Sequence, residues 1–141
     1  DTGKKLLNHS KENDFVLVLP RTNKLEYQSL LNNADLLFLT SYEQNKGWYP
    51  VKLFDYYKTT KPILLCPSDN DVIEEFIIST ESGYIADTAE ACESTILMLF
   101  DEKSKGSSIS MIRNENAGMK FSRKYQTKKL ADLIFNDRFN D

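Results

Sequence analysis

Residues 36–66 of the sequence read LLFLTSYEQNKGWYPVKLFDYYKTTKPILLC. The stretch opens with one short apolar run, 36–39, and closes with another, 63–66. Continuous apolar runs of this length are typical of strands that are buried on both faces, as in a parallel sheet. Between the runs, residues 50–57 have the apolar spacing of one helix face, and Pro50 suits a helix start, where its missing N–H does no harm. The stretch therefore predicts a strand, a helix and a second, parallel strand.

The same two patterns continue on both sides of this unit. Apolar runs at 15–19 and 83–86 predict two further strands. Apolar residues with helical spacing occupy the segments between and after the strands. The expected helices cover approximately residues 23–34, 72–77, 87–100, 109–119 and 125–136. Strands that alternate with helices predict an α/β fold with an open parallel sheet, flanking helices and a helical C-terminal tail.

Two of the expected helices have recognisable starts. Asn23 with Glu26 has the spacing of a capping box, and Asp87 with Glu90 has the same spacing. The helix after Asp87 is expected to turn one apolar stripe toward the sheet. The stripe consists of Ala89, Cys92, Ile96, Leu99 and Phe100.

Composition limits the class of protein. The chain has 141 residues, with 18 Lys and Arg against 21 Asp and Glu, and its net charge of −3 does not favour nucleic acid as a partner. No apolar run reaches the roughly 18 residues of a membrane span, and no secretory signal is visible.

Cys66 and Cys92 lack a CxxC neighbour, so we expect buried free thiols, which suit a reducing, cytoplasmic location. Because the sequence does not begin with methionine, we expect residues 1–141 to be a single, partial domain of a longer protein.

Ligands of open parallel sheets bind at the carboxyl ends of the strands. In this chain those ends are followed by residues 20–22, 40–49 and 67–71. The alternative is that all three segments are ordinary surface loops.

Several segments of the sequence match, in the same order, the motifs of one enzyme family. They are Ala34-Asp35 with the run 36–39, Lys52-Leu53-Phe54-Asp55-Tyr56, Lys61-Pro62-Ile63-Leu64, Ser82-Gly83-Tyr84-Ile85-Ala86-Asp87 and Phe121-Ser122-Arg123. This series resembles the C-terminal, donor-binding domain of glycosyltransferases with the GT-B fold, over approximately residues 14–135. The resemblance implies a Rossmann-like sheet. It also implies a transferase that moves a sugar from a nucleoside-diphosphate sugar to a glycan or lipid-linked acceptor, as in polysaccharide biosynthesis.

The resemblance also implies roles for single residues. Asp55 stands in the place of the second Glu of the family's Glu-x7-Glu motif, where a carboxylate accepts hydrogen bonds from the ribose hydroxyls. Lys52 and the first amides of the same helix suit the diphosphate. Arg21 suits the base or a phosphate, and Tyr49 suits the sugar. Gly47, eight residues before Asp55, stands in the place of the first Glu, so the retaining stereochemistry that the full motif implies does not carry over.

Each of these residues also has an alternative interpretation. Asp55 suits a solvated helix surface, and Lys52 suits an ion pair with Asp55. Arg21 suits a solvated loop. Tyr49 belongs to an aromatic group with Tyr42 and Trp48, whose alternative role is to pack the loop on the next helix.

The family's second domain has no counterpart in this chain. Two strands expected upstream are absent as well, and no catalytic residue, metal ligand or cofactor can be assigned. The expected partners are therefore a nucleotide sugar and a separate N-terminal acceptor domain, and the chain alone is expected to be inactive. We also expect an open sheet edge, or one filled by a partner chain.

Two further interpretations remain open at this point. Basic residues between 103 and 129 suit peripheral contact with anionic lipid, although a solvated helix surface is their commoner meaning. A non-catalytic, flavodoxin-like signalling or interaction module is the alternative function. A receiver domain of that kind needs acidic residues where Pro20-Arg21 and Thr40-Ser41 stand.

Overall fold

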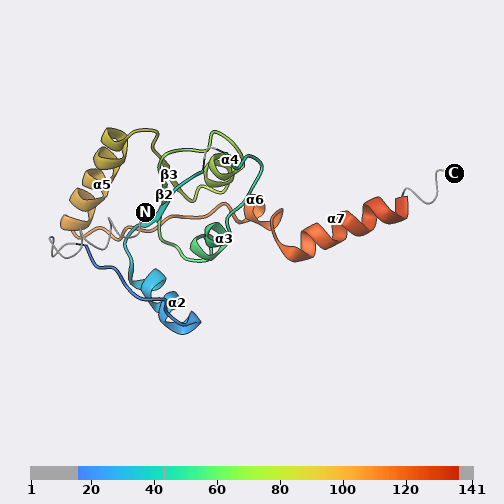
Figure 1. Ribbon diagram of the computed structural model, residues 1–141, viewed down its shortest axis with the longest axis horizontal. Coiled ribbons are helices and arrows are strands. Elements are labelled where there is room, and N and C mark those ends of the chain that lie inside the picture. The colour runs from blue at the N-terminus through green and yellow to red at the C-terminus, as the bar shows by residue number, and fades with distance from the viewer. Residues whose placement is uncertain (1–15, 43, 137–141) are drawn as a thin grey trace. The chain divides into compact units, whose positions relative to one another are not determined.

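The computed structural model describes residues 16–42 and 44–136 (Figure 1). The chain divides into two compact units, Asp1–Asn33 and Ala34–Asp141.

The first unit contains helix α2 (Lys24–Asn33). The capping box predicted for it is confirmed. The Asn23 Oδ1 accepts the N–H groups of Leu25 and Glu26, both at 3.0 Å, and the Glu26 carboxylate accepts the Asn23 N–H at 3.2 Å. The two side chains satisfy backbone donors that have no partner within the first turn.

The strand predicted at 15–19 is wrong for residues 16–19, which form neither strand nor helix, while Phe15 lies outside the described residues. Leu17 is 80% exposed. A strand needs a neighbour to pair its N–H and C=O groups, and none pairs with this run in the described part of the chain. Apolar composition alone therefore did not produce a strand here.

The second unit contains a parallel three-stranded sheet in the order β1-β2-β3. Its strands are β1 (Leu37–Leu39), β2 (Ile63–Leu65) and β3 (Gly83–Ile85). Three of the four predicted strands are thus confirmed, each one residue or so shorter than expected. Their last predicted residues still bond to the sheet, since Cys66 N–H donates to the Leu39 carbonyl and Ala86 N–H to the Leu65 carbonyl, both at 2.9 Å.

The sheet has one fully buried central strand and an open side. All three residues of β2 have no exposed surface, as expected for a strand covered on both faces. Among the described strands, β1 pairs on one side only. The Leu37 N–H and the Leu39 carbonyl point to β2, so the backbone groups of Phe38 point away from it. The expected open edge is present in this unit.

Helices cover the sheet from two sides (Figure 1). Helices α3 (Val51–Tyr57) and α4 (Val72–Ser79) lie on one side, and α5 (Ala89–Ser104) lies on the other. The core on the first side joins strands and helices. It contains Leu39, Leu53, Ile63, Leu65, Ile73, Phe76 and Ile77. Two more helices follow in the chain, α6 (Glu115–Met119) and α7 (Arg123–Asn136).

The expectations for α5 are corrected in two respects. Its N-cap is Thr88, whose hydroxyl accepts the Ala91 N–H at 3.2 Å, and not Asp87. Leu99 is the one buried residue of the predicted stripe, whereas Ile96 and Phe100 are exposed. A helix of this length extends about 24 Å, whereas three-residue strands extend about 10 Å. The sheet is therefore too short to cover the whole stripe.

The segment before α6 is not the helix predicted over 109–119. Its backbone N–H groups instead donate hydrogen bonds to residues before two strands. The Met111 N–H donates to the Thr60 carbonyl at 2.8 Å, and the Asn114 N–H donates to the Thr80 carbonyl at 2.9 Å. These bonds fasten the segment across the amino ends of β2 and β3. Helical spacing of the apolar residues gave no indication of this competing pairing.

Close contact between two strands requires a glycine at one position of the sheet. A Cβ atom on Gly83, the first residue of β3, would lie 1.8 Å from the Ile63 carbonyl oxygen. No side chain fits at that distance, so the strand begins with the one residue that lets β2 and β3 pair here.

Candidate functional site

The loops that follow β1 and β2 are bonded to each other at the carboxyl end of the sheet. The Gly47 N–H donates to the Asp71 carboxylate at 2.6 Å, and the Lys46 ammonium donates to the backbone carbonyl of Asp69. Gly47 has a φ of 67°, a conformation that a side chain disfavours. Gly47 therefore serves the shape of this loop, and a glutamate in its place would be strained.

The N-terminus of α4 is already occupied by a carboxylate of the chain. Asp69 is 4% exposed and accepts the N–H groups of Ile73 at 2.9 Å, Glu74 at 3.0 Å and Asp71 at 3.3 Å. These bonds satisfy backbone donors that an anionic ligand would otherwise need. The sequence analysis missed this role, although an Asp shortly before an apolar helical run is a known capping signal.

Asp55 lines a cavity of the second unit with a volume of about 710 Å³. That volume lies within the usual range of small-molecule sites, about 300–1,000 Å³. The walls come from α3, α4 and the corner between α6 and α7. The lining residues are Val51, Phe54, Asp55, Tyr57, Lys58, Phe76, Gly118, Phe121, Ser122 and Arg123.

Aromatic rings form the floor of this cavity. Phe76 lies 4.7 Å from Phe121 and 5.7 Å from Phe54 between ring centroids, in edge-to-face contacts. Tyr49 packs against the same group, 5.5 Å from Phe121 and 5.9 Å from Phe54. Burial, and then the carboxylates of Glu75 and Asp71, raise the pKa of Tyr49. The ring of Tyr49 thus supports the floor, as its packing interpretation had it, and its contact with a sugar stays a prediction.

Asp55 is about one-third exposed and has a weak partner. The Lys58 ammonium lies 3.5 Å from its carboxylate, and the Lys58 side chain is 75% exposed. An exposed pair of this kind contributes about 0–1 kcal/mol. The alternative ion pair between Lys52 and Asp55 is not formed. Lys52 lies exposed on the same helix, one turn before Asp55.

The other wall of the cavity carries a cation that the sequence analysis did not assign. Arg123 begins α7 beside Ser122, and both line the cavity together with Asp55. The motif Phe121-Ser122-Arg123 indicated closing helices but gave no reason to expect those helices at α3. Arg21 belongs to the first unit and is exposed there, so its role at this site stays a prediction.

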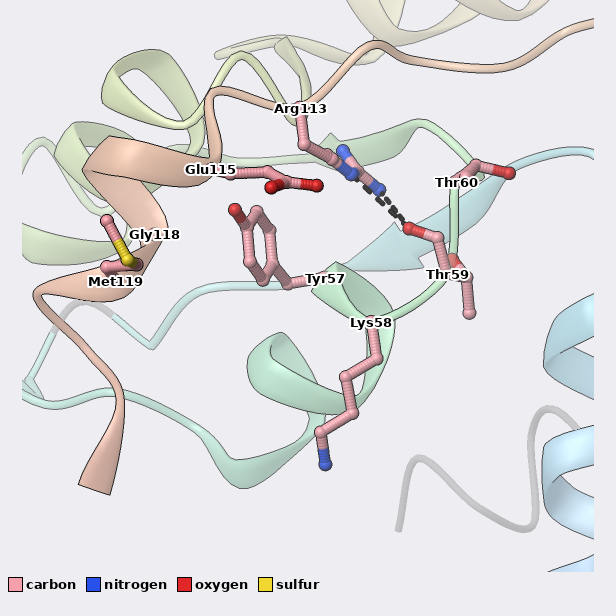
Figure 2. A pocket seen from close by; sticks show the side chains of 8 residues that line it. All are labelled: Tyr57, Lys58, Thr59, Thr60, Arg113, Glu115, Gly118 and Met119. Carbon is pink, nitrogen blue, oxygen red and sulfur yellow. Dashed lines mark hydrogen bonds between the residues drawn. The ribbon is translucent and has the colours of Figure 1, made fainter. Parts of the chain in front are cut away.

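A second cavity, of about 420 Å³, lies at the C-terminal end of α3 and shares Tyr57, Lys58 and Gly118 with the first (Figure 2). Its most polar group is Arg113, whose guanidinium carbon lies 5.4 Å from the ring centre of Tyr57. Arg113 donates to the carbonyls of Thr59 at 3.0 Å and Lys61 at 2.6 Å, and also to that of Ser82. Burial lowers the pKa of Arg113. Its donors are largely used within the chain, so Arg113 itself has a structural role.

The basic residues between 103 and 129 fall into separate groups. Lys103 pairs with Asp35, and Lys105 pairs with Asp101. Lys120, Lys124 and Lys128 are spaced four residues apart and line one cavity of about 370 Å³. The exposed apolar side chains of α7 are Tyr125, Leu130, Leu133, Ile134 and Phe135. Contact with a lipid surface stays a prediction.

No known family model, curated protein or solved structure matches this chain. The resemblance to GT-B glycosyltransferases therefore rests on the motif series alone. Across residues 16–42 and 44–136, no helix is long and apolar enough to cross a membrane. The same residues bring no three His, Cys, Asp or Glu side chains together as metal ligands.

Proposed function

We propose that this chain is the donor-binding domain of a GT-B-type glycosyltransferase. It would hold a nucleoside-diphosphate sugar for transfer to a glycan or a lipid-linked acceptor. One observation carries the proposal: the motifs lie, in the family's order, on a parallel α/β unit. Asp35 precedes β1, the segment Lys52–Tyr56 lies in α3, Lys61-Pro62 precedes β2 and Gly83 begins β3.

Asp55 is the central residue of the proposed site. Its carboxylate lines a cavity of suitable volume and accepts hydrogen bonds only. The two neighbouring hydroxyls of a ribose are donors that match it. The ion pair with Lys58 is exposed and weak, so a ribose can replace the ammonium group at little cost in free energy.

The charges around Asp55 suit the diphosphate. Arg123 stands on the facing wall of the cavity, and Lys52 lies on α3 one turn before Asp55. Guanidinium groups bind phosphate oxygens in pairs, and an ammonium group adds a positive charge. The α4 N-terminus takes no part, since the Asp69 carboxylate occupies it.

Calorimetric titration of the full chain with nucleoside diphosphates and the matching nucleosides tests this proposal. We expect Asp55→Ala to lose charge-assisted hydrogen bonds of about 1.5–3 kcal/mol, which weakens the best diphosphate roughly 10- to 150-fold. Asp55→Glu is expected to bind, since the family usually places Glu here.

Asp101→Ala is the matched control, because Asp101 also lies on a helix surface and pairs with a lysine, at i,i+4. It should bind the diphosphate as the unmodified chain does. The proposal is wrong if no nucleoside diphosphate binds, or if Asp55→Ala and Asp101→Ala bind it equally well.

A further inference from the structure

The two cysteines of the sequence lie close together at the carboxyl end of the sheet. Cys66 directly follows β2, and Cys92 lies in the second turn of α5. The sequence analysis expected two buried thiols, but both side chains are partly exposed. A small oxidant in solvent can therefore reach them, and a chain with two cysteines has one intramolecular pairing available.

Both cysteines donate to one carbonyl oxygen. The Cys66 thiol lies 3.7 Å from the Thr88 oxygen, and the Cys92 N–H donates to the same oxygen at 3.0 Å. Thr88 is also the N-cap of α5, through its side chain. The start of α5 thus fixes the backbone of Cys92 beside the thiol of Cys66.

The backbone around Cys66 is also held by hydrogen bonds. The Cys66 N–H donates to the Leu39 carbonyl at 2.9 Å, and the Ala86 N–H donates to the Leu65 carbonyl at 2.9 Å. Both bonds continue the parallel pairing of the sheet past its last strand residues. Burial, and then the neighbouring Cys66 thiol, raise the pKa of Cys92. The geometric link between the two residues is the Thr88 oxygen, to which both donate.

We propose that Cys66 and Cys92 are a redox-active pair that forms a reversible intramolecular disulfide when the chain meets a peroxide. The Cys66 thiolate attacks one peroxide oxygen, the O–O bond breaks, and Cys66 becomes a sulfenic acid as water leaves. The Cys92 sulfur then attacks the sulfenic sulfur, the S–S bond forms, and a second water leaves. Two thiols thereby lose two electrons and two protons, and one hydrogen peroxide becomes two waters.

The proposal assigns the first attack to Cys66 and the resolving step to Cys92, and the reverse order would form the same disulfide. Both side chains are partly exposed, and the attacking species is a thiolate in either order. The bond joins the carboxyl end of β2 to the start of α5, next to the loop that Gly47 and Asp71 connect. This pair does not depend on the proposed donor binding.

Oxidation of the reduced, full chain with hydrogen peroxide tests the pair. We expect a monomer that has lost the mass of two hydrogen atoms and both titratable thiols. A non-reducing peptide map should join the peptide of Cys66 to that of Cys92, and dithiothreitol should restore both thiols. Dimers linked through disulfides, or two thiols that survive treatment, would overturn the proposal.

Two comparisons separate a native pair from chance oxidation. Cys92→Ser should stop at a sulfenic acid that a dimedone probe traps on Cys66, and Cys66→Ser should form no intramolecular disulfide. The disulfide should also form faster in the native chain than in guanidinium chloride, where the two cysteines are no longer held together. Equal or slower formation in the native chain would show that the fold does not bring the thiols together.

Discussion

At the scale of single residues, several residues near the proposed site have structural roles in the fold. Asp69 is the clearest example, since three backbone N–H groups occupy its carboxylate. Tyr49 packs among phenylalanine rings, and Gly47 supplies a left-handed loop conformation. Asp55 and Lys52 remain accessible on α3. The two accessible residues are the ones on which binding experiments should concentrate.

Lys52→Ala is expected to weaken nucleoside diphosphates about 2- to 5-fold, because an exposed charge interaction is worth up to about 1 kcal/mol. The matching nucleosides should bind with unchanged affinity, since they lack the phosphate that Lys52 would contact. Calorimetric titration with both ligand types measures the difference. Lys105→Ala, which removes another exposed lysine, serves as the control. An equal loss for nucleoside and diphosphate would exclude a phosphate contact.

The raised pKa of Tyr49 predicts that the folded chain loses stability in alkaline solution. Its pKa in the folded chain is raised above the ordinary 10.0, first by burial and then by Glu75 and Asp71. The folded chain therefore holds this proton more tightly, so the stabilisation is complete below pH 10.0 and is lost as the pH rises through the folded pKa.

Denaturant unfolding at a series of pH values above 10 measures this effect. The free energy of unfolding of Tyr49→Phe is expected to fall less steeply with pH than that of the unmodified chain. Tyr42→Phe is the control, since the Tyr42 ring is exposed. If both variants follow the same pH curve, Tyr49 does not contribute to the alkaline loss.

At the scale of secondary-structure elements, local signals and neighbouring backbone compete for the same hydrogen bonds. The capping box at Asn23 and Glu26 forms as predicted. At α5 the predicted cap is displaced by one residue, because the Thr88 hydroxyl and not the Asp87 carboxylate reaches the Ala91 N–H. The two residues are adjacent and both suit an N-cap, so spacing alone could not decide between them.

Thr88→Ala is expected to lower the free energy of unfolding by about 1 kcal/mol, the usual effect of removing an N-cap. Asp87→Ala, the neighbouring control, should change it by no more than about 0.3 kcal/mol, a typical charge effect near a helix N-terminus. Urea unfolding followed by circular dichroism measures both. A larger effect for Asp87→Ala would restore Asp87 as the cap.

At the scale of the whole molecule, the parts of the fold with strong local patterns were predictable. The three parallel strands and the helices that link them follow from apolar runs and helical spacing. The strand at 15–19 could not be judged in this way, because pairing depends on a neighbour that its own residues do not encode. The cavity beside Asp55 was equally beyond reach, since Ser122 and Arg123 join it from more than 60 positions further along the chain.

The proposed activity also belongs to this scale. Sugar transfer requires donor and acceptor to be held together in one cleft, and the proposed site accounts for the donor alone. We expect the purified 141-residue chain to bind a nucleoside diphosphate without transferring sugar from any nucleotide sugar. Product analysis with radiolabelled donors and glycan or lipid-linked acceptors measures this. Turnover by the chain alone would show that no second domain is needed.

Arg113 joins the starts of two strands through one side chain. Its guanidinium donates to the carbonyls of Thr59 and Lys61, which precede β2, and to the carbonyl of Ser82, which precedes β3. Segments that share such hydrogen bonds open together as one cooperative unit. We therefore expect the starts of β2 and β3 to exchange their amide hydrogens together, and Arg113→Ala to let them exchange independently.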